Sequence, residues 1–419
     1  MTARSRRPGK PASASRVEIV GTPGGYGLLR DGLPYTVRGA GMGSGDLAGL
    51  AAHGGNSIRN WTTRGVAGLL DQAQASGVTV SLCLPMRAER AGFDYDDPQA
   101  VARQLESCRE DVLRYRDHPA LLVWIIGNEL NHSYSNAKVY DAVNDVAEMI
   151  HELDPNHPAT TAVEGFPPAV IAEILARAPA LDFISFQLYG SLFDLPGKIR
   201  STGFARPFMV TEWGTTGYWE AEKTPWGAPV ELTSSEKADI LMRANREVLA
   251  GLAGQLIGSH VFMWGQKQER TPTWFGLLLE SGEETESVDV MHHIWTGDWP
   301  GNRSPRVDAL RLDGRGARDG VTLVAGGTYA ASFDVRDPDG DPLRFRWEVR
   351  PESEATQAGG DFEPPIPELE GCLADPAAPA TTVRVAAPGK YRLFAYAHDD
   401  HGHAAHANIP FLVQPLEPS

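Results

Sequence analysis

The chain has 419 residues, of which 42% are hydrophobic, and this is enough to bury a large core. Its formal net charge of −16 disfavours nucleic acid and anionic membranes as partners, because both require clustered Lys and Arg side chains. The three cysteines, Cys83, Cys108 and Cys372, lie too far apart for a disulfide framework or a paired metal motif. The length fits one barrel of about 250 residues with an appendage.

The N-terminal segment is rich in Pro, Ser, Ala and Arg, which predicts a disordered tail over residues 1–16. No apolar run approaches the roughly 18 residues that would span a bilayer. The twin Arg6-Arg7 is not followed by the hydrophobic stretch of a secretory signal. As written, the chain is therefore expected to be cytoplasmic, and periplasmic or secreted if a leader has been removed.

From residue 35 onward, short apolar or β-branched runs alternate with longer stretches of helical spacing, which is typical of a parallel sheet with crossover helices. In the stretch before the fourth strand, apolar residues recur at intervals of three and four from Val101 to Tyr115. The predicted strands are 35–40, 56–61, 78–84, 121–126, 159–163, 181–187, 207–212 and 256–264. Eight such units predict a (β/α)8 barrel over residues 17–302.

A doubly wound open sheet is the main alternative to the barrel. Such a sheet usually carries a Gly-rich phosphate turn after its first strand and an acidic residue at the end of its second. Here "GAGMGSGDLAG" matches the turn only loosely, and "RNW" ends the second strand. The barrel is therefore favoured.

The pattern of apolar residues in the sequence changes after residue 302. Helical spacing disappears, and the short alternating runs "TYAASFDV", "LRFRWEV", "TTVRVA" and "YRLFAYAHDD" are separated by turn residues. This predicts an all-β sandwich over residues 303–419. Its aspartates Asp334, Asp337, Asp339 and Asp341 are typical of hairpin turns, with a calcium site as the alternative.

Two carboxylates are expected to meet at the mouth of the barrel, where the carboxyl ends of the strands converge. The fourth predicted strand ends in "WIIGNEL", with Asn128 and Glu129, and the seventh ends in "MVTEWG", with Glu212. Facing carboxylates suit glycosidic bond cleavage, in which one is the acid and the other the nucleophile or base. Apolar surroundings and a neighbouring negative charge raise the pKa of the acid. Either residue alone fits a strand end paired with Arg or Lys, but the pair favours catalysis.

The segments "WIIGNEL" and "MVTEWG" resemble those of the clan A glycoside hydrolases, retaining barrels that include families 2 and 5. The resemblance implies that Glu129 is the general acid/base, Glu212 the nucleophile and Asn128 a donor to the sugar 2-hydroxyl. The segment "GGNSIRNW" resembles the second strand of family 2 and of the family 72 glucanosyltransferases. That likeness implies that Arg59 keeps the nucleophile ionised.

The same resemblance implies that Tyr189, after the sixth strand, touches the nucleophile. It also implies that Trp264, at the end of the eighth strand, forms an aromatic floor for the sugar, with core packing as the alternative. Further candidates for substrate binding are Trp61, His132, Glu164, Trp213, Gln268 and Trp274. The segment "DVRDPDGDPLRFRWEV" resembles the immunoglobulin-like or polycystic-kidney-disease-type modules of carbohydrate enzymes.

These features predict a retaining β-glycoside hydrolase that acts on a β-glucan or β-glucoside by double displacement. A transglycosylase using the same site is one alternative, and a non-catalytic carbohydrate-binding scaffold is another. The expected partner is an oligo- or polysaccharide, and no cofactor or metal is expected, since no histidine spacing matches a metal site. Retention predicts that the carboxyl groups of Glu129 and Glu212 lie about 5 to 5.5 Å apart.

Overall fold

The computed structural model describes residues 14–43, 45–357 and 359–416, so most of the expected N-terminal tail lies outside the described ranges. The chain forms two compact units. The first comprises Met1–Trp213 and Leu249–Val261, and the second comprises Gly214–Val248 and Phe262–Ser419.

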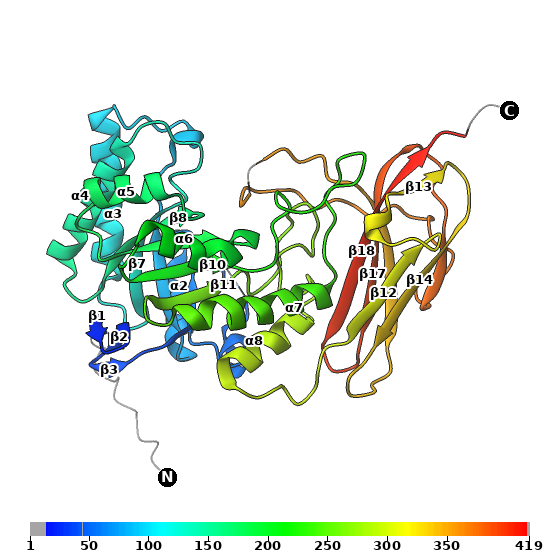
Figure 1. The fold of residues 1–419 in the computed structure, drawn as a ribbon, viewed down its shortest axis with the longest axis horizontal. Helices are drawn as coiled ribbons and strands as arrows, with labels where there is room; N and C mark the ends of the chain where they lie inside the picture. The colour runs from blue at the N-terminus through cyan, green and yellow to red at the C-terminus, as the bar shows by residue number, and fades with distance from the viewer. Residues whose placement is uncertain (1–13, 44, 358, 417–419) are drawn as a thin grey trace, which may run out of the picture. The chain divides into compact units, whose positions relative to one another are not determined.

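The first unit holds a closed barrel with the strand order β10-β11-β4-β5-β6-β7-β8-β9, and Figure 1 shows several of these strands surrounded by helices. The strands are β4 (Val37–Gly41), β5 (Ser57–Arg59), β6 (Thr79–Leu84), β7 (Leu121–Asn128), β8 (Ala159–Glu164), β9 (Phe183–Leu188), β10 (Phe208–Trp213) and β11 (Leu256–Val261). Neighbouring strands pair in parallel around the ring. The predicted barrel is confirmed, and an open doubly wound sheet is excluded. The eighth strand was predicted to end at Trp264, but it ends at Val261.

Helices follow the strands, as the alternation in the sequence predicted. They are α1 (Leu47–Ala52), α2 (Val66–Ala75), α3 (Pro98–Tyr115), α4 (Lys138–Leu153), α5 (Pro168–Arg177) and α6 (Leu195–Thr202). The start of α3 is fixed by Asp97, whose side chain accepts hydrogen bonds from the backbone N–H groups of Gln99 and Ala100 at 2.9 and 3.1 Å. The predicted stripe on α3 buries Cys108 and Val112.

Strand β7 ends in a sharp turn that places two polar side chains at its carboxyl end. Residues 121–126 are fully buried, because the strand lies between the barrel interior and the helix layer. Gly127 has φ 71°, and a Cβ atom there would lie 2.6 Å from the Leu130 side chain. Glu129 also has a positive φ, of 49°. The residues on either side of Asn128, Gly127 and Glu129, therefore adopt a backbone conformation that residues other than glycine rarely adopt.

A small antiparallel sheet precedes the barrel and was not predicted from the sequence. Its strands are β1 (Val17–Thr22), β2 (Gly25–Arg30) and β3 (Leu33–Pro34). Val17 and Leu28 share a core with residues near the starts of barrel strands, including Val37, Leu122 and Phe183. The sheet therefore covers the amino-terminal end of the barrel, opposite the end where the carboxyl ends of the strands converge.

The described residues of the second unit form α-helices and β-strands. They are α7 (Ser234–Ala244), α8 (Glu286–Thr296), β12 (Arg306–Leu312), β13 (Val321–Val324), β14 (Tyr329–Arg336), β15 (Arg344–Pro351), β16 (Ala380–Val383), β17 (Gly389–His398) and β18 (Ala404–Gln414). The strands form sheets of order β12-β14-β16 and β13-β18-β17-β15. Both sheets contribute to one core, in which the rings of Phe333 and Trp347 lie 6.1 Å apart. The β-sandwich predicted after residue 302 is therefore present.

The aspartate-rich segment of the sandwich forms a turn. One carboxylate oxygen of Asp337 accepts hydrogen bonds from the backbone N–H groups of Asp339 and Asp341, at 2.9 and 3.1 Å. This is the turn chemistry that the sequence favoured.

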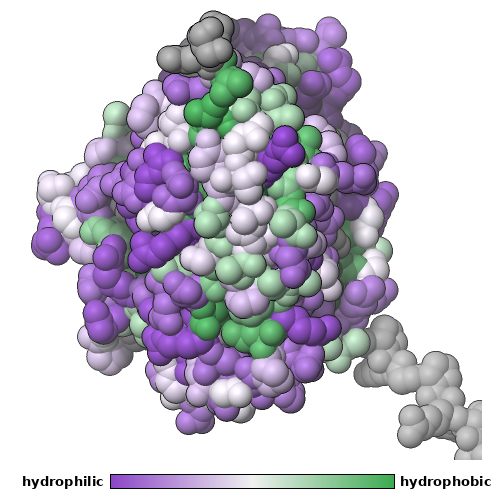
Figure 2. Space-filling view, turned by 90° about the vertical axis from the view of Figure 1, so that its right-hand side faces the viewer, coloured by the Kyte–Doolittle hydropathy of each residue, from purple (hydrophilic) through white to green (hydrophobic). Residues whose placement is uncertain are grey.

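Figure 2 shows a face of the molecule on which purple and white residues surround smaller green areas, so polar side chains are spread over this surface. In the described ranges, no helix is both long and apolar enough to cross a bilayer.

Candidate active site

Glu212 lies at the end of β10 and is held by donors from several strands. Its side chain is almost fully buried, with the residue 6% exposed. One carboxylate oxygen accepts hydrogen bonds from Arg59, from the indole N–H of Trp61 at 2.8 Å and from the amide of Gln187 at 2.9 Å. The other accepts the hydroxyl hydrogen of Tyr189 at 2.8 Å. Four donors, one of them cationic, therefore fix the position of the Glu212 carboxyl group.

Arg59, on β5, connects Glu212 to the end of the fourth barrel strand. The residue has no exposed surface, and its two terminal nitrogens contact Glu212 and the side-chain oxygen of Asn128, the latter at 2.7 Å. Its guanidinium group also lies over the Trp61 ring, 4.7 Å from the centroid. The same Asn128 oxygen accepts a hydrogen bond from Gln187 at 2.8 Å. Because that oxygen is an acceptor for two donors, the NH2 group is what Asn128 can offer to a ligand hydroxyl.

Glu129 has an environment unlike that of Glu212. Burial of its carboxyl group raises the pKa of Glu129 well above the ordinary value, and the negative charges of Glu212 and Glu164 raise it further. The positive charges of Arg59 and Arg90 act in the opposite direction. The two glutamates are therefore close enough to affect each other, and Glu129 is the one suited to hold a proton near neutral pH.

His132 and Glu164 lie beside Glu129 at the end of the barrel. The ring Nδ1 of His132 is 2.7 Å from a carboxylate oxygen of Glu164, and both side chains are partly exposed. Asn131 fixes the backbone of Glu164 through two hydrogen bonds, at 2.9 and 3.0 Å. The structure places this pair near Glu129, and its contact with substrate stays a prediction.

The other candidates are buried. Trp213, in the first unit, is 1% exposed. Trp264, Gln268 and Trp274 belong to the second unit and are 1%, 9% and 2% exposed. Trp264 packs against Trp295 at a ring distance of 6.4 Å, which fits the core-packing alternative stated for it. Their roles as substrate contacts stay predictions.

Gln187 is a site residue that sequence reasoning missed. It lies on β9, is 2% exposed and donates to both Asn128 and Glu212. The available signal was its position at the end of the sixth predicted strand, level with the ends of the strands that carry the glutamates. An amide at a strand end is less conspicuous than a carboxylate, although it can bridge two acceptors with one NH2 group.

A possible metal-binding group lies outside this set of residues. In residues 14–43, 45–357 and 359–416, the three side chains that bring carboxylate oxygens within 4.8 Å of one another are Asp337, Asp341 and Asp399. All three belong to the second unit. The site at the end of the barrel strands consists of carboxylates, amides, aromatic donors and one buried arginine.

Comparisons with known proteins match the part of the chain that forms the barrel. Residues 53–216 match the model for "Glycosyl hydrolases family 2, TIM barrel domain". Mannan endo-1,4-beta-mannosidase F of Aspergillus clavatus is 26% identical over 167 residues, which cover 33% of this chain and 38% of that protein. The chain therefore spans well under two thirds of the length of this relative.

Solved structures share the fold at low sequence identity. Bacteroides uniformis beta-glucuronidase 2, covalently bound to cyclophellitol-6-carboxylate aziridine, gives a TM-score of 0.53 at 13% identity, covering 96% of this chain and 48% of that one. The FMN-binding beta-glucuronidase from Facaelibacterium prausnitzii L2-6 gives 0.51 at 16% identity, covering 96% and 60%. The matches extend over nearly all of this chain but only about half of the known structures.

The matched family segment runs from before Arg59 to just beyond Glu212, so it includes both glutamates and the residues that connect them. Over this segment the barrel is therefore similar to the TIM barrel domain of glycosyl hydrolases family 2.

Proposed function

We propose that the chain is a retaining β-glycoside hydrolase in which Glu212 is the nucleophile and Glu129 the general acid/base. The observation that carries this proposal is the contrast between the two carboxyl groups. Glu212 accepts hydrogen bonds from four side chains, which hold its carboxyl group in one orientation. The pKa of Glu129 is instead raised by burial and by neighbouring carboxylates, which favours its protonated form. Glycoside cleavage needs one carboxyl group of each kind.

In the first step, Glu212 attacks the anomeric carbon while Glu129 gives its proton to the leaving oxygen, and a covalent glycosyl-enzyme forms. In the second step, Glu129 takes a proton from water, the water oxygen attacks the anomeric carbon, and Glu212 leaves as a carboxylate. Arg59 and Tyr189 orient Glu212 in both steps. Asn128 is placed to donate a hydrogen bond to the neighbouring sugar hydroxyl.

The substrate we propose first is a β-glucan or β-glucoside. The relatives suggest two further sugars for the same test, because one is named a mannan endo-1,4-beta-mannosidase and the structural neighbours are named beta-glucuronidases. A substrate panel should therefore contain aryl β-glucoside, β-mannoside and β-glucuronide, together with β-glucan and β-mannan oligosaccharides.

The decisive experiment compares the full chain with Glu212→Gln on this panel, with Glu106→Gln on the exposed side of α3 as a matched control. The wild type and the control are expected to hydrolyse at least one substrate of the panel. Glu212→Gln is expected to lose activity by several orders of magnitude. Proton NMR of the first product should show the β anomer from a β substrate. An α product would contradict retention. Oligosaccharide binding without turnover by the wild type would instead support the scaffold alternative.

A further inference from the structure

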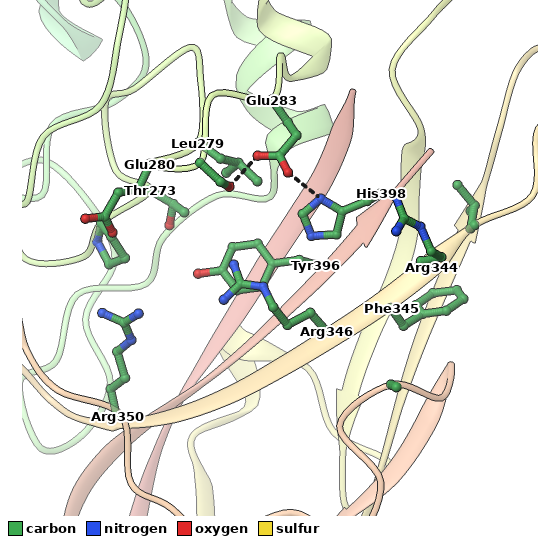
Figure 3. Close-up of a pocket in the computed structure, with 14 residues that line it drawn as sticks. Thr273, Leu279, Glu280, Glu283, Arg344, Phe345, Arg346, Arg350, Tyr396 and His398 are labelled. Atoms are coloured by element: carbon green, nitrogen blue, oxygen red, sulfur yellow. Dashed lines mark hydrogen bonds and ion pairs between the residues drawn. The ribbon is translucent and has the colours of Figure 1, made fainter. Parts of the chain in front are cut away.

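The second unit contains a cavity of about 780 Å³, and none of its lining residues belongs to the barrel site. Its walls come from the segment between residues 272 and 283 and from strands β15 and β17 (Figure 3). The lining side chains that matter for its chemistry are Glu280, Glu283, Arg344, Arg346, Arg350, Tyr396 and His398. Its volume falls within the range of about 300–1,000 Å³ that is usual for small-ligand sites.

Backbone hydrogen bonds hold the two walls together. The N–H of Glu284 donates to the carbonyl of Gly402 at 3.0 Å, and the N–H of Ala404 donates to the carbonyl of Glu284 at 2.8 Å. Leu279, on the same segment, packs against Phe394 and Tyr396. The cavity is therefore built into the fold of the second unit and does not depend on a loose loop.

One wall is a row of flat groups. Tyr396 and His398 line the cavity, and Phe394 lies beyond them on the same face of the sheet, because the three residues alternate along β17. Their rings stack with centroid distances of 6.4 and 6.3 Å and interplanar angles of 10° and 25°. On the neighbouring strand, Arg346 pairs in register with Tyr396, and its guanidinium group lies 4.0 Å from the centre of that ring. Figure 3 shows Arg346 lying against the Tyr396 ring.

The positive charges of this wall are balanced. Arg346 and Arg350 share the buried carboxylate of Glu348, which Arg350 contacts at 2.7 and 3.0 Å. On the opposite wall, Glu283 contacts His398 at 3.3 Å, and the neighbouring Glu280 is exposed. The cavity therefore presents guanidinium donors and carboxylate acceptors side by side, with little net charge.

We propose that this cavity is a second carbohydrate site, which takes a short segment of a neutral polysaccharide. Sugar hydroxyls are both donors and acceptors, so they can pair with guanidinium and carboxylate groups at once. An anion would be repelled by Glu280 and Glu283, and a cation by the arginines. The choice of a sugar as ligand rests on the proposed function of the barrel, whereas the balance of charge and donors in the cavity is independent of it. Binding at this site retains a polymeric substrate on the chain that carries the barrel.

Direct binding tests the proposal in a chain that cannot turn the ligand over. Full-length Glu212→Gln is titrated calorimetrically with β-glucan and β-mannan hexasaccharides, and with oligogalacturonate as an anionic comparator. Arg346→Ala or His398→Ala in that background should weaken one binding event about tenfold or more, as expected for the loss of a polar contact to the ligand. The control Arg336→Ala removes an exposed arginine on β14, paired with Asp308, and should change nothing. Equal dissociation constants for all variants would overturn the proposal. Tighter binding of the oligogalacturonate than of the neutral hexasaccharides would overturn it as well.

Kinetics separates this proposal from the proposed activity. Arg346→Ala in the otherwise wild-type chain should raise the KM for polysaccharide severalfold and leave kcat/KM for an aryl glycoside unchanged. If the wild type hydrolyses no glycoside, the proposed function fails, and the titration still decides whether the cavity binds sugar. An equal loss on polymer and aryl glycoside would contradict a separate site.

Discussion

At the scale of single residues, the two glutamates differ in what surrounds them. Glu212 sits among donors, and Glu129 sits among other carboxylates with a positive φ at the end of its strand. The sequence was sufficient to place both at strand ends, because each follows an apolar run, and their catalytic roles stay a prediction. Gln187 was not predicted from the sequence, because its role depends on contacts with Asn128 and Glu212, which lie on other strands.

Replacing Glu129, the proposed acid, should stabilise the fold at neutral pH. Below about pH 4, the carboxyl group of residue 129 is protonated in both folded and unfolded chains, so Glu129→Gln should have little effect. As the pH rises towards the raised pKa of the folded state, the unfolded chain releases its proton first, which favours unfolding of the wild type. Urea unfolding at several pH values should therefore show a growing stability advantage for Glu129→Gln. An advantage that does not change with pH would contradict the raised pKa.

Arg59→Lys should disable the site although it keeps the charge. Arg59 contacts Glu212 and Asn128 with separate nitrogens, and a lysine ammonium group cannot reproduce that planar fork. The loss of one charge-assisted hydrogen bond, about 1.5–3 kcal/mol, corresponds to a roughly 10- to 100-fold fall in kcat/KM. Arg64→Lys, an exposed change in the loop after β5, is the control. An unchanged kcat/KM on an aryl glycoside would show that activity does not require the two separate guanidinium contacts of Arg59.

At the scale of elements, the barrel strands were predictable because each is a short apolar run between turn residues and helical stretches. The sheet formed by β1, β2 and β3 was missed, although Asp31 and Gly32 gave a hairpin signal. Their φ values of 53° and 77° fit the tight turn between β2 and β3. The strands themselves were not apparent, because glycines and prolines interrupt their apolar pattern.

Two glycine substitutions should have opposite effects on stability. A Cβ atom at Gly39 on β4 would lie 2.3 Å from the His260 ring inside the barrel, so Gly39→Ala should destabilise the chain by about 1–3 kcal/mol. Gly68 lies within α2, where a Cβ atom meets nothing within 4 Å, so Gly68→Ala should stabilise by about 0.5–1 kcal/mol. Chemical denaturation of both variants measures the difference. Equal midpoints would mean that the barrel interior can move to accept a methyl group at residue 39.

At the scale of the molecule, a buried polar network connects α7 and its preceding loop to the β-sandwich within the second unit. Glu231 accepts hydrogen bonds from Lys237 at 2.5 Å, Thr271 at 2.6 Å and Asn408 at 2.6 Å. Burial alone would raise the pKa of Glu231, but the charge of Lys237 and the hydrogen bonds from Lys237 and Thr271 lower it to about 2. The residue is therefore ionised in the interior.

Lys237→Met should strongly destabilise the second unit, because it leaves Glu231 charged, buried and without its cationic partner. The expected loss is about 3–5 kcal/mol. Arg318→Met removes an exposed cation that contacts Glu222 and Glu236, and should cost only about 0–1 kcal/mol. Thermal unfolding of the two variants tests this contrast. Similar losses would indicate that the Lys237 pair is no more important than a surface pair.

The sequence by itself determined the barrel, the sandwich and the positions of Glu129, Glu212 and Arg59 at strand ends, because apolar periodicity and turn residues act locally. The tertiary structure decided which side chains meet, such as Gln187 with Glu212 and Asn408 with Glu231. Those contacts join residues on different strands, and closing the barrel or packing the sheets brings them together. Their geometry depends on many weak packing interactions at once, and no short stretch of sequence records it.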